Sequence, residues 1–165
     1  MAATTSGTAK VTLPMDDQIL ITREFAAPRH RVYKAYTTPE LVKRWWSGHH
    51  GQTTIAEIDL RVGGTWRYAM VAEDGSEVAF HGEYREIVPN ERIVTTEVFE
   101  GAPETPDAQV PLNIVTFTEV GGRTTLTLLV QCPSKEVRDM IINSGMESGM
   151  QEGMDLLEQI AVSLR

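Results

Sequence analysis

The chain has 165 residues, of which 41% are hydrophobic, and a formal net charge of -8. This length and composition predict one domain with a full hydrophobic core, and the acidic balance argues against nucleic acid as a partner. No apolar stretch of the sequence is long enough to cross a bilayer, so we do not expect a membrane partner.

The cysteine content and the N-terminal composition bear on location. Cys132 is the single cysteine, so an internal disulfide is excluded. Residues 1–10 form a Thr/Ala/Ser/Gly-rich run with neither a basic start nor an apolar core. We therefore expect a flexible tail over 1–10, a single domain over 11–165, and a cytoplasmic location.

A strand and two short helices are predicted at the start of the domain. Residues 19–25 are rich in β-branched residues and are followed by Ala27-Pro28, which indicates a strand that ends there. Pro28 suits the first position of a helix that reaches Tyr36, and Thr38 is a suitable N-cap for a second helix that ends near Trp46.

From Gln52 to Cys132 the sequence shows short β-rich runs separated by turn residues, without a helical period. The runs cover residues 53–61, 65–72, 77–88, 92–100, 112–120 and 123–132. The tight turns between neighbours predict antiparallel hairpins. The longer loop over 101–111 contains three prolines and is either a surface flap that gates a site or a tolerated insertion.

A terminal helix follows, with Ser134 as its N-cap. The hydrophobic positions Val137 and Ile141 are out of phase with the apolar line that begins at Met146, which predicts a break at Ser144–Gly145. The element order predicts an α+β helix-grip fold. In this fold a curved antiparallel seven-stranded sheet wraps around a long C-terminal helix, and two short helices follow the first strand.

The terminal helix carries two adjoining stripes. Met146, Met150 and Met154 recur every four residues, and Gly145, Gly149 and Gly153 share that spacing. Thioethers are flexible, and each glycine costs a helix about 1 kcal/mol relative to alanine. The pattern favours a face that lines an adaptable cavity, but plain core packing, with glycine permitting close approach, explains it equally well.

The search for catalytic chemistry identifies no strong motif. Adjacent His49 and His50 are poorly placed to bind one metal ion, and Cys132 has no basic neighbour that would activate it. His81 and Tyr84 could act in general acid–base catalysis, whereas cross-strand charge pairing is the simpler explanation for His81. No phosphate-binding loop is present. We therefore predict no catalytic residue, no metal and no cofactor.

Several short motifs occur in an order that resembles one known superfamily. They are Phe25-x-Ala27-Pro28, Val32-x-x-Ala35, Thr38-Pro39-Glu40, Trp45-Trp46, Asp59-Leu60-Arg61-x-Gly63-Gly64, Asp74-Gly75, the Gly82 strand and Gly145-Met146-x-x-Gly149. From Val11 to Arg165 the chain resembles the START-like (SRPBCC, birch-pollen-allergen-like) superfamily, in the branch similar to the activator of heat-shock protein 90 ATPase. The motifs are specific for the fold rather than for one activity.

The resemblance implies a deep cavity between the sheet and the terminal helix that holds a small hydrophobic molecule. The ligand-binding residues that we predict for it are Trp45, Trp46, Trp66, Tyr68, Met70, His81, Met146, Met150 and Met154. The sequence leaves undetermined which face of residues 65–72 points into the cavity. If the opposite face of residues 65–72 pointed inward, Arg67 and Ala69 would replace the aromatic residues.

Three classes of function remain. The first is binding or carriage of a small hydrophobic ligand without catalysis. The second is a co-chaperone-like protein interaction through the outer surface, although the eukaryotic activators carry a further domain and a linker. The third is an enzyme of the cyclase or hydrolase kind that uses polar groups of the same cavity. A homodimer, formed through an edge strand or the outer sheet face, is a further expectation.

Overall fold

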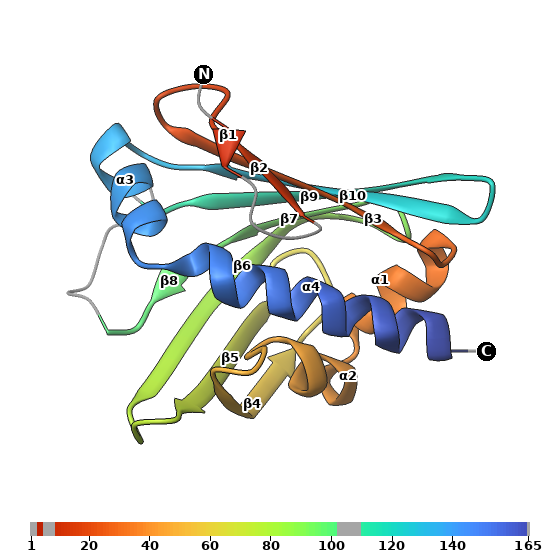
Figure 1. Cartoon of the computed structure of the whole chain (residues 1–165), viewed down its shortest axis with the longest axis horizontal. Coiled ribbons are helices and arrows are strands. Elements are labelled where there is room, and N and C mark those ends of the chain that lie inside the picture. The colour runs from red at the N-terminus through yellow and green to blue at the C-terminus, as the bar shows by residue number, and fades with distance from the viewer. Residues whose placement is uncertain (1–2, 5–8, 102–109, 165) are drawn as a thin grey trace.

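A curved antiparallel sheet and a long C-terminal helix form the two layers of the computed structural model, which describes residues 3–4, 9–101 and 110–164 (Figure 1). The strands are Ala3–Thr4 (β1), Lys10–Thr12 (β2), Gln18–Phe25 (β3), Gly51–Ile58 (β4), Thr65–Ala72 (β5), Glu77–Val88 (β6), Arg92–Thr96 (β7), Val98–Phe99 (β8), Leu112–Val120 (β9) and Arg123–Gln131 (β10). Their spatial order is β1-β2-β3-β10-β9-β7-β6-β5-β4, and β8 pairs with β6. The pairings between these strands are antiparallel.

The predicted count of seven strands is wrong, because the described residues form ten. β1 and β2 contain two and three residues, too few to leave an alternating pattern in the sequence. The run predicted over 92–100 is divided into β7 and β8 at Glu97. The other six predicted strands occur, with boundaries that differ by a few residues. Most of the predicted flap, residues 102–109, lies outside the described residues.

The helices of the described chain are α1 (Arg29–Thr37), α2 (Pro39–Trp45), α3 (Lys135–Asn143) and α4 (Met146–Ser163). The predicted break between α3 and α4 is confirmed, because Gly145 adopts φ +81, a conformation that ends a helix. Ser134 caps α3 by accepting a hydrogen bond from the Val137 amide at 3.2 Å. Thr38 stands at the N-cap position of α2, but its hydroxyl donates instead to the Lys34 carbonyl oxygen at 2.6 Å.

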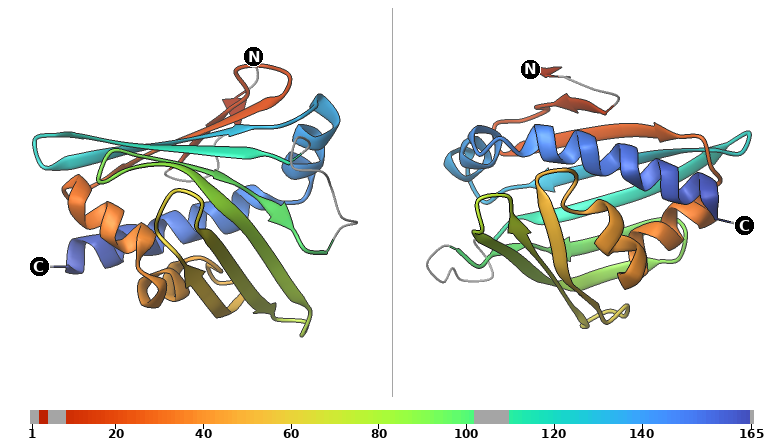
Figure 2. Two further views of the ribbon diagram at one scale, coloured as in Figure 1. Left: turned by 180° about the vertical axis from the view of Figure 1, so that it is seen from behind. Right: turned by 60° about the horizontal axis from the view of Figure 1, so that its bottom comes forward.

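Helix α4 lies along the concave side of the sheet, and α1 and α2 pack beside it (Figures 1 and 2). The core fills much of the space between these layers. Its fully buried members include Phe25, Phe117 and Leu126 from the sheet, Val32 from α1 and Leu157 from α4. Among the helices that the structure describes, none is both long and apolar enough for a membrane crossing.

Candidate functional site

One flank of α4 is held by β3 and by Ala9, the residue before β2. The Arg23 side chain on β3 is 4% exposed, and its guanidinium lies 2.7 Å from Asp155 Oδ1 and 3.2 Å from Glu158 Oε2, both on α4. The Gln151 side chain accepts from the Ala9 amide at 2.9 Å and donates to the Ala9 carbonyl at 2.8 Å. These polar contacts, made by the buried side chains of Arg23 and Gln151, set the position of the helix on this side.

The glycine stripe forms the other flank of α4, where α2 and the segment after it approach closely. A Cβ atom on Gly153 would lie 3.1 Å from the Trp45 carbonyl oxygen, and one on Gly149 would lie 3.6 Å from His50 Cδ2. The His49 amide donates to Glu152 Oε1 at 2.8 Å on the same side. Gly153 therefore permits close approach, as one of the two interpretations of the stripe proposed, whereas the space at Gly149 would accept a Cβ atom at ordinary contact distance.

The methionine stripe lies between these two flanks, so it faces the concave centre of the sheet. Met154 is 5% exposed and belongs to the core. Met146 and Met150 pack against the same core but are only half-buried. The stripe thus changes from core packing to a partly open surface toward the start of α4.

The opposite wall comes from β5 and β6. Pairing sets Trp66 opposite Gly82 and Tyr68 opposite Phe80, and these side chains point to the concave face together with Met70. Trp66 is 6% exposed. Tyr68, Met70 and Phe80 keep part of their surface accessible. Arg67 and Ala69 therefore point to the outer face.

The two adjacent tryptophans have different surroundings. Trp45 is 8% exposed, and its indole nitrogen donates to the Ala35 carbonyl at 3.0 Å, so it packs as part of the core. Trp46 is half-buried, and its ring centroid lies 5.5 Å from that of Tyr68 and 5.9 Å from that of Phe80. Of this pair, Trp46 is the residue that reaches the inner aromatic wall.

His81 does not join the other predicted residues. It lies on the outer face of β6, is exposed, and its Nδ1 atom is 2.9 Å from Glu100 Oε2. The Arg67 guanidinium binds the same carboxylate through two hydrogen bonds of 2.9 and 3.0 Å. His81 thus takes part in polar pairing on an exposed face, as the simpler explanation from the sequence proposed, with Glu100 and Arg67 as its neighbours.

We expect a Glu100→Gln variant to be less stable than the wild type at neutral pH, with a difference that disappears in acid. Hydrogen bonds from Arg67 lower the pKa of Glu100 from 4.5 to about 2. A lowered pKa stabilises the fold above the unfolded-state value, and this contribution is lost as pH falls toward the folded-state value. Urea denaturation of both proteins between pH 7 and pH 2 measures the difference, and a constant difference across this range would contradict the ion pair.

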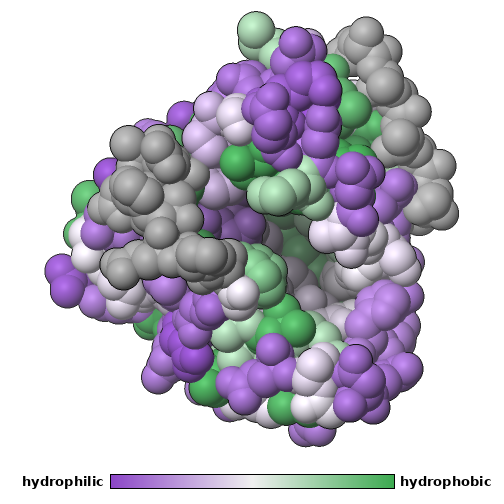
Figure 3. Space-filling view, turned by 90° about the vertical axis from the view of Figure 1, so that its left-hand side faces the viewer, coloured by the Kyte–Doolittle hydropathy of each residue, from purple (hydrophilic) through white to green (hydrophobic). Residues whose placement is uncertain are grey.

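Figure 3 shows a hollow on the face of the molecule near α3 and β8, with hydrophobic residues at its rim and in its depth. The half-buried side chains of the two walls agree with this view. Trp46, Tyr68, Phe80, Met146 and Met150 would lose their accessible surface if α4 packed directly on the sheet along its whole length. The interior between α4 and the sheet is therefore incompletely filled at this end.

Glu97 carries a carboxyl group near this interior that the sequence motifs did not indicate. Glu97 follows β7, and its carboxylate accepts a hydrogen bond of 3.2 Å from the Asn113 side-chain amide on β9. Burial raises the pKa of Glu97. The Asn113 Oδ1 atom is buried and has no hydrogen-bond partner within the described residues. Ile93 and Thr95 have the same phase along β7, and Glu97 continues it. This alternation could have predicted that Glu97 shares the inward face of Ile93.

Tyr36 lies close to this carboxyl group, and Tyr68 and Tyr84 lie close to Tyr36. Burial raises the pKa of Tyr36, and the nearby Glu97 charge raises it further. Burial likewise raises the pKa of Tyr68, with smaller contributions from Tyr84 and Tyr36. None of these three phenol groups has a hydrogen-bond partner within the described residues. We call Tyr36, Tyr68, Tyr84, Glu97 and Asn113 the inner polar cluster.

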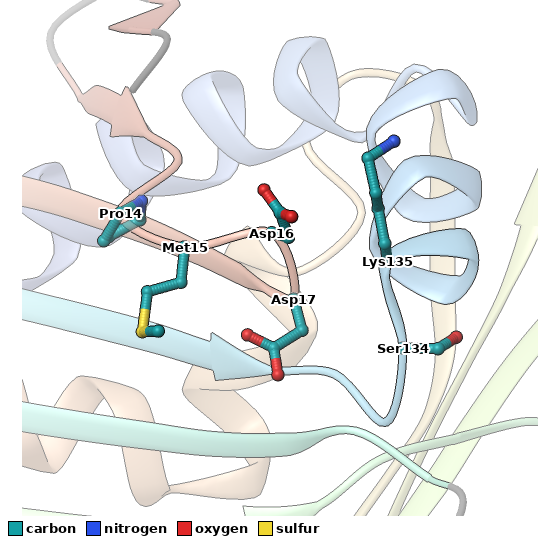
Figure 4. Close-up of a pocket in the computed structure, with 6 residues that line it drawn as sticks. All are labelled: Pro14, Met15, Asp16, Asp17, Ser134 and Lys135. Carbon is teal, nitrogen blue, oxygen red and sulfur yellow. The ribbon is translucent and has the colours of Figure 1, made fainter.

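A second depression lies outside this interior, between the β2–β3 turn and the start of α3, with a volume of about 600 Å³. Figure 4 shows its lining residues on the two facing segments, and none of them belongs to the predicted site. They are Pro14, Met15, Asp16, Asp17, Ser134 and Lys135.

Cys132 is 3% exposed, and burial raises the pKa of its thiol to about 11. Such a thiol is a poor nucleophile at neutral pH. Over residues 3–4, 9–101 and 110–164, no three His, Cys, Asp or Glu side chains are grouped so that they could hold a metal ion.

Comparison with known proteins agrees with the family resemblance of the sequence motifs. Residues 26–161 match the family described as Activator of Hsp90 ATPase homolog 1-like protein. Protein Ms6760 from Mycobacterium smegmatis is 25% identical, with 99% of both chains covered and a TM-score of 0.82. Protein CV1439 from Chromobacterium violaceum is 27% identical over 89% of this chain and 98% of that chain, with a TM-score of 0.76.

A protein from Rhodobacter sphaeroides shares the fold at 21% identity, with a TM-score of 0.84 over 95% of this chain and 99% of that chain. A search of curated proteins gave no match. The family model spans most of the chain, including α1, α2 and nearly all of α4. This chain therefore belongs to the Activator of Hsp90 ATPase homolog 1-like family, within the SRPBCC superfamily.

Proposed function

We propose that this protein binds a small hydrophobic molecule between the concave face of the sheet and helix α4. The observation that carries the proposal is the half-buried state of side chains on both facing walls. Met146 and Met150 on α4 and Tyr68 and Phe80 on the sheet point into the interior, yet they keep accessible surface. A ligand that covered this surface would gain about 25 cal/mol for each Å² of apolar area removed from water.

The character of the walls supports binding rather than a rigid core. Methionine side chains adapt to different shapes because they are unbranched, and Met146 and Met150 are the half-buried members of the stripe. Aromatic rings supply the facing surface. They belong to Trp46 directly after α2, Tyr68 on β5 and Phe80 on β6. Such a site, mostly apolar with few polar groups, is typical of small-molecule pockets.

A fluorescence titration with N-phenylnaphthylamine, a neutral probe that brightens in apolar surroundings, tests the proposal. We expect a saturable increase that corresponds to about one probe per chain and that octanol reverses by competition. Native mass spectrometry of the purified protein, followed by denaturing extraction, would identify a molecule that co-purifies. A signal that does not saturate, or that octanol leaves unchanged, would contradict a defined interior site.

A further inference from the structure

The inner polar cluster contains one acidic group without a cationic partner. Glu97 forms no ion pair with any residue that the structure describes, and its side chain accepts a hydrogen bond from the neutral Asn113 amide. Residues 102–109, which follow β8 in the sequence, contain no Lys, Arg or His. Glu97 is only half-buried, but its surroundings exclude much of the water, and a carboxylate in such surroundings is costly when no cation balances its charge.

The surroundings of Glu97 accept hydrogen bonds and favour positive charge. Asn113 Oδ1 is an acceptor without a partner in the described part of the chain. The phenol group of Tyr36 is close enough to Glu97 for the two to interact electrostatically. The Tyr68 and Trp46 rings of the aromatic wall contact each other at 5.5 Å between their centroids, and aromatic faces attract cations and repel anions.

We propose that the ligand of this site is an apolar molecule that carries a protonated amine, and that Glu97 binds the ammonium group. This inference rests on the proposed function and names its ligand class. The ammonium would donate hydrogen bonds to the Glu97 carboxylate, with the Tyr36 hydroxyl as a further acceptor. The apolar body would lie along Met150 and the aromatic wall.

The same geometry disfavours two other common ligand types. A fatty acid would bring its carboxylate against Glu97, and like charges in a poorly solvated interior repel strongly. A neutral alcohol could form a hydrogen bond with Glu97 but would leave the charge of the carboxylate uncompensated. We therefore expect the order of affinity to be amine, then alcohol, then carboxylate, for the same hydrocarbon chain.

Competition against N-phenylnaphthylamine tests the inference with octylamine, octanol and octanoate at neutral pH. We expect octylamine to bind the wild type at least about tenfold more tightly than octanol. In Glu97→Gln this preference should fall to within about twofold, while octanol affinity stays the same. Glu83→Gln is the matched control, because Glu83 lies on the outer face of β6 beside Arg85 and should leave all three affinities unchanged.

The outcomes separate the two proposals. Equal affinities for octylamine and octanol in the wild type, or a preference that survives in Glu97→Gln, would overturn the amine assignment while leaving the hydrophobic site in place. Tighter binding of octanoate than of octanol would also overturn it. Failure of the probe and of all three competitors to bind would instead contradict the proposed function itself. Thermal denaturation of both variants checks that each remains folded.

Discussion

Replacement of Met150 by tryptophan is expected to weaken binding of the neutral probe at least about tenfold without unfolding the protein. Met150 lies in the middle of the methionine stripe, between the flank held by Arg23 and the flank where α2 meets Gly153. It is half-buried, so a larger ring has space to occupy, and that space is the one that we assign to the ligand. The filled interior should then exclude the probe.

Val162→Trp is the control for this variant, because Val162 is also on α4 but is 52% exposed. This control adds the same ring to the same helix outside the proposed site, and we expect it to bind the probe with wild-type affinity. Circular dichroism and thermal denaturation establish that both variants are folded. Unchanged affinity in a folded Met150→Trp protein would show that this part of α4 is not a wall of the binding site.

Gly82→Ala is expected to destabilise the fold by about 3 kcal/mol, at the upper end for overpacking. A Cβ atom at this position would lie 1.9 Å from the Thr96 carbonyl oxygen and 2.6 Å from Trp66 Nε1. The same two atoms form a hydrogen bond of 3.2 Å that closes the aromatic wall behind Tyr68. Because the clashing oxygen belongs to the backbone, relief requires β6 or β7 to move.

Gly149→Ala provides the contrast for this prediction. The added Cβ would meet His50 Cδ2 at 3.6 Å, which is ordinary van der Waals contact, and alanine favours the helix by about 1 kcal/mol. We therefore expect this variant to be more stable than the wild type, while Gly82→Ala loses roughly 10 °C in melting temperature. Urea denaturation of both gives the free energies of unfolding, and similar values for the two variants would contradict the steric argument.

Features that depend on local period and phase could be predicted from the sequence. The apolar positions Val137 and Ile141 belong to one helical phase and Met146 to another, and this shift correctly predicted the break at Gly145. The order of the short motifs likewise predicted the family and the helix-grip arrangement. Strands β1 and β2 were missed because they are too short to show alternation. β2 pairs with β3 and β1 pairs with β2, so both depend on strands elsewhere in the chain.

The face of a strand that points inward was harder to predict. Alternation grouped Trp66 with Tyr68, and His81 with Glu83, but it did not state which group faced α4. Pairing of Tyr68 with Phe80, and contact of both rings with Trp46, orient the first group inward. Because His81 has the opposite phase to Phe80 on the same strand, it points outward to Glu100.

The sequence by itself determined the period of each element, the break before α4 and the family, because these depend on neighbouring residues along the chain. Only the tertiary structure decided that Glu97 meets Asn113 and Tyr36, and that Tyr68 lies near Tyr36. These residues come from α1, β5, β9 and the residue after β7, so their proximity depends on how the sheet curves around α4. A carboxyl group in a β-rich run looks like a fully solvated surface residue until that packing shows that it is half-buried beside Asn113.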